Sequence, residues 1–416
     1  HMLFKGTKTL GTKDYAAEKP LLEKIKTVGQ KIDLLVNSRD ADPQELQQLR
    51  DQLKELQNEH RTLVVKNEFS KIYAENGGVG YNAFTGKDLT TYLINLPANK
   101  LELWAAIESD RLENAVFREF YTERDVVHEE RRRSYESSPG GLMYETLLAT
   151  AYKVHPYRNP VIGWNSDIEN LDPDQIRIFF DKYYTPVNMV ITLVGDFDSQ
   201  ATLQMVDHYF GKLAPGTPVP PVVDREPEQK GERRVTINFD AEQQLMIAYH
   251  KPAMPHRDDY IFDILMQVLC EGRTSRLYQS LVVEKQLVAD VAVFTAPGAR
   301  YDNLMILSMT PRQGCACPNI EEAVYAELDR LKTELLSSAE LDIARKQILT
   351  SILRGMEGNS ELARMLSSYQ TLGDWRYLAD YEEQLNTVTA EDIMAVAQRY
   401  FRADNRTVVT LIRGEN

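Results

Sequence analysis

The feature that most constrains the fold of this chain is an internal repeat, in which two stretches match at a single offset of 217 residues. Residues 171–193 correspond to residues 388–410. Polar landmarks recur at the same offset: Tyr183 with Tyr400, and Asn188 with Asn405. Helix–turn–strand segments are common, but shared landmarks at one offset favour duplication over chance. The 416 residues are therefore expected to form two homologous α+β halves.

Each copy predicts the same local structure. A side chain that can accept hydrogen bonds from the first helical turn, Asp172 or Thr389, begins a helix. A turn and a β-branched strand follow, at Val190–Leu193 in the first copy and Thr407–Thr410 in the second.

The boundary between the halves is a Pro-rich stretch. Residues 213–233 contain Ala-Pro-Gly-Thr-Pro-Val-Pro-Pro, a composition typical of a linker. We therefore predict a first domain at residues 1–212 and a second domain at residues 234–416.

The second half contains a segment that the first half lacks. Met2–Gly6 matches Val268–Gly272 at an offset of 266, so Arg233–Gln267 has no counterpart before His1. This segment predicts two strands and most of a helix: Val235–Phe239, Leu245–Tyr249 and the residues from Asp258 onward. We expect the first half to lack these elements, to be an N-terminally truncated domain, and to expose an edge of its sheet.

The first half in turn contains an extra segment. The two offsets differ by about 50 residues, and residues 15–69 are rich in Leu, Glu, Lys and Gln. Apolar residues at helical spacing lie on both sides of a break at Asn37–Pro43. This pattern predicts a projecting, coiled-coil-like helical hairpin whose removal should leave both halves folded.

The net charge argues against nucleic-acid binding, and the hydropathy argues against a membrane-spanning segment. The formal net charge of −14 argues against sequence-independent nucleic-acid binding, which needs clustered Lys and Arg. No run of about 18 apolar residues is present, so we expect no transmembrane segment.

The first seven residues, His1-Met-Leu-Phe-Lys-Gly-Thr7, allow two interpretations. In one, Met2 begins the reading frame and His1 is a remnant of a tag. In the other, His1 is a metal ligand near the end of a helix that begins before residue 1. These residues alone do not distinguish the two.

An acidic segment contains two further candidate site residues. Glu123 and Glu130 are seven residues apart, which puts them on the same side of a helix. A solvated charged face, with Glu paired to Arg131–Arg133, would give the same pattern.

Together these segments resemble the M16 family of zinc peptidases, which includes pitrilysin, insulinase and the mitochondrial processing peptidase. Residues 1–7 resemble the end of its H-x-x-E-H motif, with His1 as the second His. Residues 123–130 resemble its E-R-x-x-V-x-x-E pattern. Further matches extend over the whole chain: His155–Pro160, Gly163–Ile168, Tyr183–Asn188, Val194–Asp196 and Gly272–Tyr278.

The resemblance implies the fold and a zinc site. Each half would be a mixed β-sheet covered by helices, and Zn²⁺ would be held by His1 and Glu130. Glu123 would lie behind the ligands and orient them, while the general-base Glu is expected upstream of residue 1. Removing the predicted hairpin brings the separation of His1 and Glu130 to the family's spacing.

The resemblance also implies substrate contacts. Asn82 and Ala83 lie in a predicted strand next to glycines and match the family's Asn-Ala stretch, although a turn-forming role for Asn82 is equally open. Arg276 belongs to the matching Ser-Arg-Leu-Tyr stretch of the second half.

One departure from the family pattern concerns the oxyanion. Self-sufficient members place an Arg and a Tyr where this chain has Val282 and Ala289, neither of which can donate a side-chain hydrogen bond. The chain therefore resembles the zinc-binding subunit of the bacterial two-subunit type, with a second M16 subunit, or a homodimer, supplying the missing groups.

The expected function is that of a zinc-dependent endopeptidase that cleaves unfolded peptides inside a clamshell chamber. With two of three ligands and no general base, the chain as it stands should be inactive. The alternative is a non-catalytic M16-like structural or partner subunit. The expected compartment is the periplasm or the cytoplasm of a bacterium.

Overall fold

The computed structural model describes residues 1–414. Its contacts divide the chain into two compact units that are each assembled from separate segments. The first unit comprises His1–Ala83, Thr91–Arg131 and Ile162–Pro221, and the second comprises Phe84–Thr90, Arg132–Val161 and the residues from Val222 onward. The predicted boundary between the two homologous halves, a linker at residues 213–233, stays a prediction.

The first unit is mainly helical. Its helices are α1 (Tyr15–Val36), α2 (Pro43–Arg61), α3 (Glu68–Glu75), α4 (Leu101–Asn114), α5 (Phe120–Arg131), α7 (Asn165–Glu169), α8 (Pro173–Tyr183) and α9 (Ser199–Phe210), with short 3-10 turns η1 (Met2–Phe4), η2 (Ala98–Lys100) and η5 (Pro186–Asn188). Strands β1 (Val79–Thr85) and β2 (Thr90–Asn95) pair only with each other within residues 1–414.

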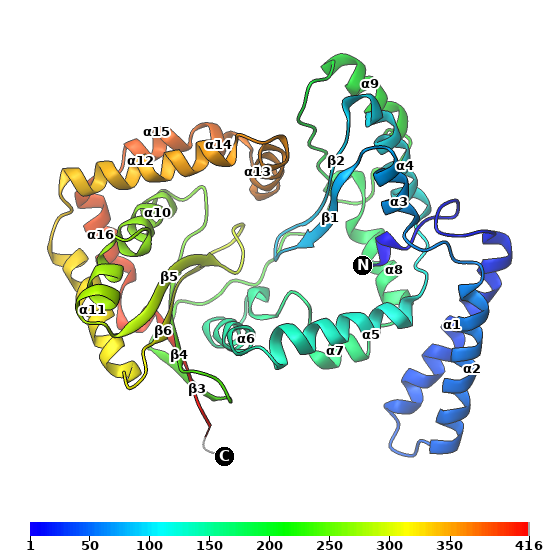
Figure 1. Ribbon diagram of the computed structural model, residues 1–416, viewed down its shortest axis with the longest axis horizontal. Coiled ribbons are helices and arrows are strands. Elements are labelled where there is room, and N and C mark those ends of the chain that lie inside the picture. The colour runs from blue at the N-terminus through cyan, green and yellow to red at the C-terminus, as the bar shows by residue number, and fades with distance from the viewer. Residues whose placement is uncertain (415–416) are drawn as a thin grey trace. The chain divides into compact units, whose positions relative to one another are not determined.

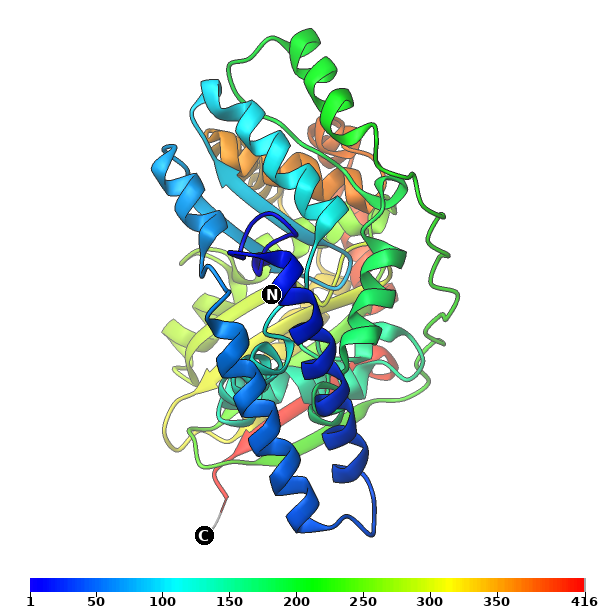
Figure 2. The same cartoon turned by 90° about the vertical axis from the view of Figure 1, so that its right-hand side faces the viewer.

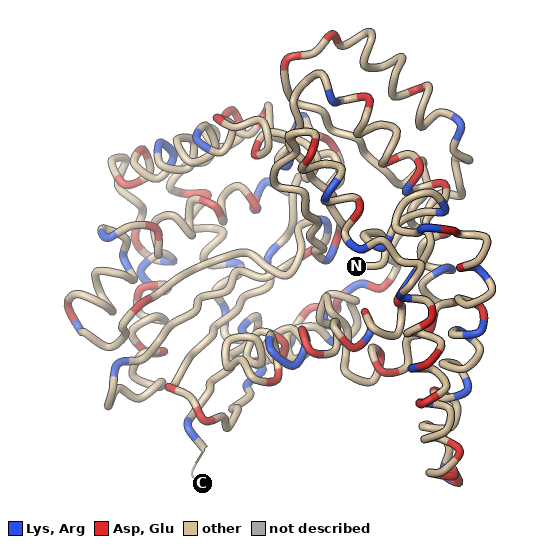
Figure 3. The backbone as a smooth tube through the Cα atoms, turned by 45° about the vertical axis from the view of Figure 1, so that its right-hand side comes forward, with Lys and Arg blue, Asp and Glu red and all other residues tan. Residues whose placement is uncertain are grey.

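The predicted helical hairpin is present as α1 and α2, which run side by side in both views (Figures 1 and 2). Asp14 and Asp42 cap the two helices, because each side chain accepts a hydrogen bond from a first-turn N–H group. Both signs of charge are interspersed along the pair, as expected for a solvated helical surface (Figure 3). Its status as an insertion stays a prediction.

The second unit is built on a five-stranded sheet in the order β3–β7–β4–β6–β5. The strands are β3 (Arg233–Asn238), β4 (Gln244–Lys251), β5 (Val288–Ala296), β6 (Asn303–Pro311) and β7 (Arg406–Ile412). The helices are α6 (Pro139–Ala151), α10 (Arg257–Cys270), α11 (Cys317–Thr333), α12 (Ser338–Gly355), α13 (Asn359–Leu372), α14 (Arg376–Ala379), α15 (Tyr381–Asn386) and α16 (Ala390–Tyr400). Two π-helical segments, η3 (Arg132–Glu136) and η6 (Tyr278–Glu284), and two 3-10 turns, η4 (Pro156–Arg158) and η7 (Ala403–Asn405), complete the unit.

This sheet is mixed and is covered on both faces, because successive side chains of a strand point to opposite sides. β3 is parallel to β7, and the other neighbouring strands are antiparallel. On one face Ile247 and Leu307 pack with α10, α11 and α16. On the other face Ala248 and Ile306 pack against α6 (Figure 1). The predicted α+β class and the second-half strands and helix are confirmed.

The repeat is confirmed at the level of individual hydrogen bonds. Asp172 of α8 and Thr389 of α16 each form a capping box with the side chain three residues on. After each helix an Asn side-chain amide donates to a carbonyl five residues earlier: Asn188 to Tyr183 and Asn405 to Tyr400, both at 2.9 Å.

The predicted strand at Val190–Leu193 is wrong, because this segment forms no regular secondary structure. Its counterpart, Thr407–Thr410, lies in β7 between β3 and β4, where Val408 is fully buried. The described part of the first half contains no equivalent of β3 or β4. Without neighbouring strands, the backbone N–H and C=O groups of this segment can form hydrogen bonds only with water. The segment therefore lies at the surface, where the Ile191 side chain is exposed.

Candidate metal centre

The N-terminal turn presents His1 to the rest of the first unit. In η1 the amides of Phe4 and Lys5 donate to the carbonyls of His1 and Met2 at 3.0 and 3.1 Å. Leu3 is buried against Ala115 and Phe180, which fixes the turn to the core.

Gly6 ends this turn with a φ of 109°. A Cβ at this position would lie 2.3 Å from the carbonyl oxygen of Leu10, so only glycine fits here.

Helix α5 presents two carboxylates to His1. His1 Nδ1 lies 3.3 Å from Glu123 Oε2, and His1 Nε2 lies 3.5 Å from Glu130 Oε2. Glu123 is largely buried, with 15% of its side chain exposed, whereas Glu130 is 52% exposed. The imidazole therefore lies between a shielded carboxylate and an accessible one, and the three predicted residues are close together.

A lysine completes the surroundings of Glu123. Lys5 Nζ forms an ion pair with Glu123 Oε1 and lies 3.5 Å from Glu119 Oε2. Glu119 has a φ of 55°, a left-handed conformation that is uncommon for residues other than glycine. The sequence predictions did not include Lys5 or Glu119, because Glu119 lies just before α5 and approaches Lys5 only through the fold.

A fully buried arginine fixes the loop that carries Lys5. Arg118 donates from Nη1 to the Lys5 carbonyl at 3.1 Å, from Nη2 to the Thr7 carbonyl, and from Nε to Glu18 Oε1 at 2.6 Å. Glu18 of α1 also lies 2.8 Å from His60 Nε2 of α2. Burial alone would raise the pKa of Glu18, but the hydrogen bonds from His60 and Arg118 outweigh it and lower the pKa.

The helical hairpin also supports α5 directly. Arg124 of α5 makes two hydrogen bonds to Asp33 of α1, at 2.9 and 3.0 Å. Gly29 of α1 packs so closely on Tyr121 that an added Cβ would lie 2.0 Å from the Tyr121 ring. The hairpin is therefore not an independent projection, since its base is part of the packing around the site.

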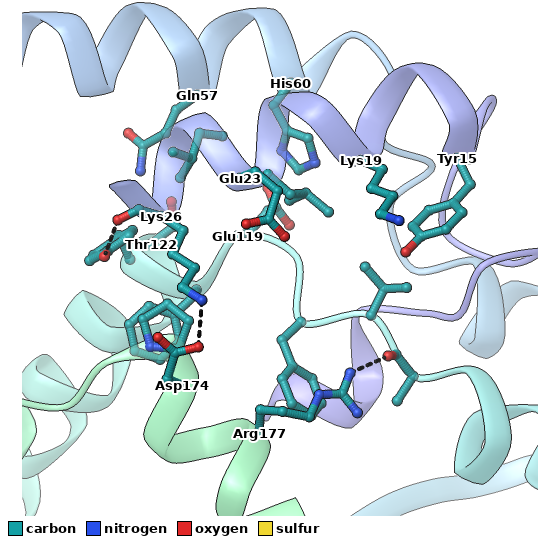
Figure 4. Close-up of a pocket in the computed structure, with 18 of the residues that line it drawn as sticks. Tyr15, Lys19, Glu23, Lys26, Gln57, His60, Glu119, Thr122, Asp174 and Arg177 are labelled. Carbon is teal, nitrogen blue, oxygen red and sulfur yellow. Dashed lines mark hydrogen bonds and ion pairs between the residues drawn. The ribbon is translucent and has the colours of Figure 1, made fainter. Parts of the chain in front are cut away.

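A pocket of about 280 Å³ lies between the hairpin, the residues that precede α5, and α8 (Figure 4). Lys26 of α1 reaches across one end of it to Asp174 of α8, and Arg177 donates to the Ala115 carbonyl at 3.0 Å. His1, Glu123 and Glu130 do not line this pocket. The candidate metal centre is therefore an accessible surface site, separate from this cavity.

The donor set of the centre fits part of a zinc site. Imidazole nitrogen and carboxylate oxygen are preferred zinc ligands, and a ligating His commonly donates its other ring N–H to a carboxylate. His1 and Glu123 have this arrangement, which leaves His1 Nε2 directed at Glu130. Zinc sites use at least three protein ligands, and no suitable group of three or more His, Cys, Asp or Glu side chains occurs within residues 1–414.

The predicted substrate residues of β1 have local roles in the structure. Asn82 is exposed, and its Oδ1 accepts a hydrogen bond from the Ala83 amide at 2.9 Å. The preceding residue of β1, Tyr81, accepts a hydrogen bond at its hydroxyl from the buried guanidinium of Arg111. Because β1 pairs only with β2, its other edge is unpaired within the described chain. Substrate contact by Asn82 and Ala83 stays a prediction.

Arg276 lies in the second unit and is engaged in an ion pair. Its Nη2 lies 2.9 Å from Glu340 Oε1 of α12, and its side chain is 13% exposed. Val282, at one of the two departures from the family pattern, is buried, and Ala289 is exposed on β5. A substrate contact by Arg276 stays a prediction, and the structure gives this side chain a packing role.

Two sequence models of one family match the chain. The model described as Insulinase (Peptidase family M16) matches residues 43–164, and the model described as Peptidase M16 inactive domain matches residues 170–348.

Curated relatives are similar over most of their length. Zinc protease PqqE of Helicobacter pylori is 29% identical over 350 residues, which cover 83% of this chain and 78% of that protein. The uncharacterized zinc protease YmxG of Bacillus subtilis is 24% identical, with 81% of each chain covered.

Solved structures have the same fold. A protease from Helicobacter pylori matches with a TM-score of 0.79 and 29% identity, covering 83% of this chain and 85% of that one. A peptidase M16 inactive domain from Pseudomonas fluorescens matches with a TM-score of 0.74 and 20% identity, covering 84% of each chain.

No helix in residues 1–414 combines the length and apolarity needed to cross a bilayer.

Proposed function

Because the chain belongs to the M16 peptidase family, we propose that it is the zinc-binding chain of an endopeptidase that cleaves unfolded polypeptides. The observation that carries the proposal is the position of the His1 imidazole between Glu123 and Glu130. The zinc proteases among its relatives support the choice of metal.

Each residue of the centre has a separate task. His1 Nε2 and Glu130 would hold the ion, and a bound zinc ion supplies a Lewis acid that lowers the pKa of a water molecule. Glu123 accepts the hydrogen bond from His1 Nδ1 and so fixes the tautomer that leaves Nε2 unprotonated. Lys5 holds Glu123 in this orientation through their ion pair.

Two further groups are needed for turnover. In the H-x-x-E-H pattern the Glu directly before the second His takes the proton of the water and passes it to the leaving amine. We propose that a second M16 chain supplies the donors for the oxyanion, since Val282 and Ala289 cannot.

The test is hydrolysis of an unfolded, fluorescently quenched peptide by a form that carries His-x-x-Glu before His1, alone and with a second M16 chain. We expect cleavage with the partner, and we expect a chelator to stop it. Glu130→Gln should lower the rate by at least about 10²-fold because a ligand is lost. Cleavage at full rate by the Glu130→Gln variant would overturn the assignment.

A non-catalytic M16-like partner subunit is the second candidate, because His1 and Glu130 are only two ligands among the described residues. If this alternative is right, the form that carries His-x-x-Glu before His1 should fold but should cleave no peptide, whichever M16 chain is added.

A further inference from the structure

A buried arginine of α4 lies among aromatic rings from four other elements of the first unit. The Arg111 side chain is 2% exposed, and its guanidinium carbon lies 4.5 to 5.8 Å from the centroids of four rings. These rings belong to Phe4 of η1, Phe69 of α3, Tyr81 of β1 and Tyr92 of β2. A cation near the faces of aromatic rings is attracted by their quadrupoles, and the attraction is stronger where water is excluded.

The guanidinium of Arg111 makes few hydrogen bonds. Its Nη2 donates to the Tyr81 hydroxyl and lies 3.1 Å from Glu108 Oε1. The same carboxylate oxygen accepts a hydrogen bond from the Tyr73 hydroxyl at 2.6 Å. Arg111 Nε and Nη1 have no hydrogen-bond acceptor among residues 1–414. The aromatic rings therefore take the place of acceptors, and they fix the position of the guanidinium.

These contacts connect the turn that carries His1 to the strand that carries Asn82. Phe4 ends η1, and its ring packs edge-on against Tyr81 with the centroids 5.2 Å apart. Successive side chains of a strand point to opposite faces, so the hydrogen bond that holds Tyr81 on Arg111 leaves Asn82 exposed on the other face. A shift of β1 by one residue would reverse both side chains. Arg111 therefore holds β1 in one register next to η1.

The imidazole of the metal centre is oriented by other groups. Glu123 accepts the hydrogen bond from His1 Nδ1, and Lys5 forms an ion pair with Glu123. The substrate strand and the metal ligands thus have separate supports within the first unit.

We propose that Arg111 is a positioning residue, which aligns a peptide bound along β1 with the metal centre through Tyr81 and Phe4. This inference rests on the proposed endopeptidase function. Loss of the Arg111 contacts displaces the peptide and leaves the affinity for zinc unchanged. Misplacement of a substrate by about 1 Å can lower a rate on the order of 10²-fold, so the effect falls on kcat.

The test uses the form that carries His-x-x-Glu before His1, with the second M16 chain and the quenched peptide. Arg111→Lys keeps a cation next to Glu108 but loses the planar group that donates to Tyr81. We expect kcat to fall at least about 10-fold, with an unchanged zinc affinity in chelator competition. Tyr81→Phe removes only the hydroxyl and should lower kcat by a smaller factor. Urea denaturation confirms that each variant is folded.

The matched control is Tyr184→Phe. It also removes one hydroxyl from a partly buried ring of the first unit, but this hydroxyl lies 3.2 Å from the Tyr92 hydroxyl instead of accepting from Arg111. Its kcat should equal that of the unsubstituted form.

Three results would overturn the inference alone, given cleavage by the unsubstituted form. They are an unchanged kcat in Arg111→Lys and Tyr81→Phe, a parallel fall of zinc affinity and kcat, and an equal effect of Tyr184→Phe. A parallel fall would mean that Arg111 only stabilises the fold. If the unsubstituted form binds zinc but cleaves no peptide, the proposed function fails, and this inference fails with it.

Discussion

At His1 a single imidazole is oriented by two carboxylates that are seven residues apart on α5. The spacing of Glu123 and Glu130 predicted that both lie on one side of a helix, and the resemblance to the M16 motif predicted that His1 lies close to them. The sequence could not predict Lys5 or Arg118, whose roles depend on contacts with residues more than a hundred positions away. Such contacts follow from tertiary packing, which leaves no local pattern.

Lys5 is expected to act as a positioning residue through Glu123. In the form that carries His-x-x-Glu before His1, Lys5→Met should weaken zinc binding about 10-fold, because loss of a group that orients a ligand typically has an effect of this size. Lys5→Arg should restore most of the affinity, since a cation is retained. Chelator competition measures the affinity. Wild-type affinity in Lys5→Met would contradict the role.

The buried pair of Arg118 and Glu18 is expected to dominate the stability of the first unit. Arg118→Met removes the buried cation from Glu18 and leaves the carboxylate with His60, so it should lower the free energy of unfolding by about 3–5 kcal/mol at neutral pH. Adding Glu18→Gln should recover part of the loss. Urea denaturation measures both, and a loss below about 1 kcal/mol for Arg118→Met would contradict the assignment.

The same pair predicts a pH dependence. The pKa of Glu18 is lowered from its ordinary value of 4.5, so its contribution is complete above that value and is lost as the pH falls through the lowered pKa. In the Glu18→Gln variant, the free energy of unfolding should therefore fall less steeply than in the wild type as the pH is lowered below about 4.5.

At the scale of elements, the helical hairpin was predicted from its leucine spacing, but its packing was not. The leucine stripe suggested a hairpin that is complete in itself, whereas Glu18, Gly29 and Asp33 of α1 contact the residues around α5. The expectation that it can be removed without unfolding the first half is therefore revised, and we now expect its complete deletion to destabilise the first unit.

Gly29→Ala tests this packing. Alanine is normally favoured in a helix by about 1 kcal/mol, but here the new Cβ would lie 2.0 Å from the Tyr121 ring. The clash should outweigh the gain and lower the free energy of unfolding by about 1–3 kcal/mol. Gly140→Ala in α6 is the matched control, because no atom lies within 4 Å of its Cβ position. Equal effects of the two substitutions would contradict the close packing.

At the scale of the whole molecule, the sequence predicted two related halves, and the capping boxes and Asn hydrogen bonds of α8 and α16 confirm the repeat. It did not predict the loss of the strand at residues 190–193. The β-branched composition favours a strand, but a strand forms only where partners complete its ladder, and composition does not report on partners.

The central claim is that His1 and Glu130 are zinc ligands, and metal affinity tests it most directly. The form that carries His-x-x-Glu before His1 should bind one zinc ion per chain by elemental analysis, whereas the chain of residues 1–416 should bind little. His1→Ala and Glu130→Gln should each weaken binding by at least about 100-fold, because a ligand is removed from a site with three. Full zinc occupancy at unchanged affinity in either variant would contradict the claim.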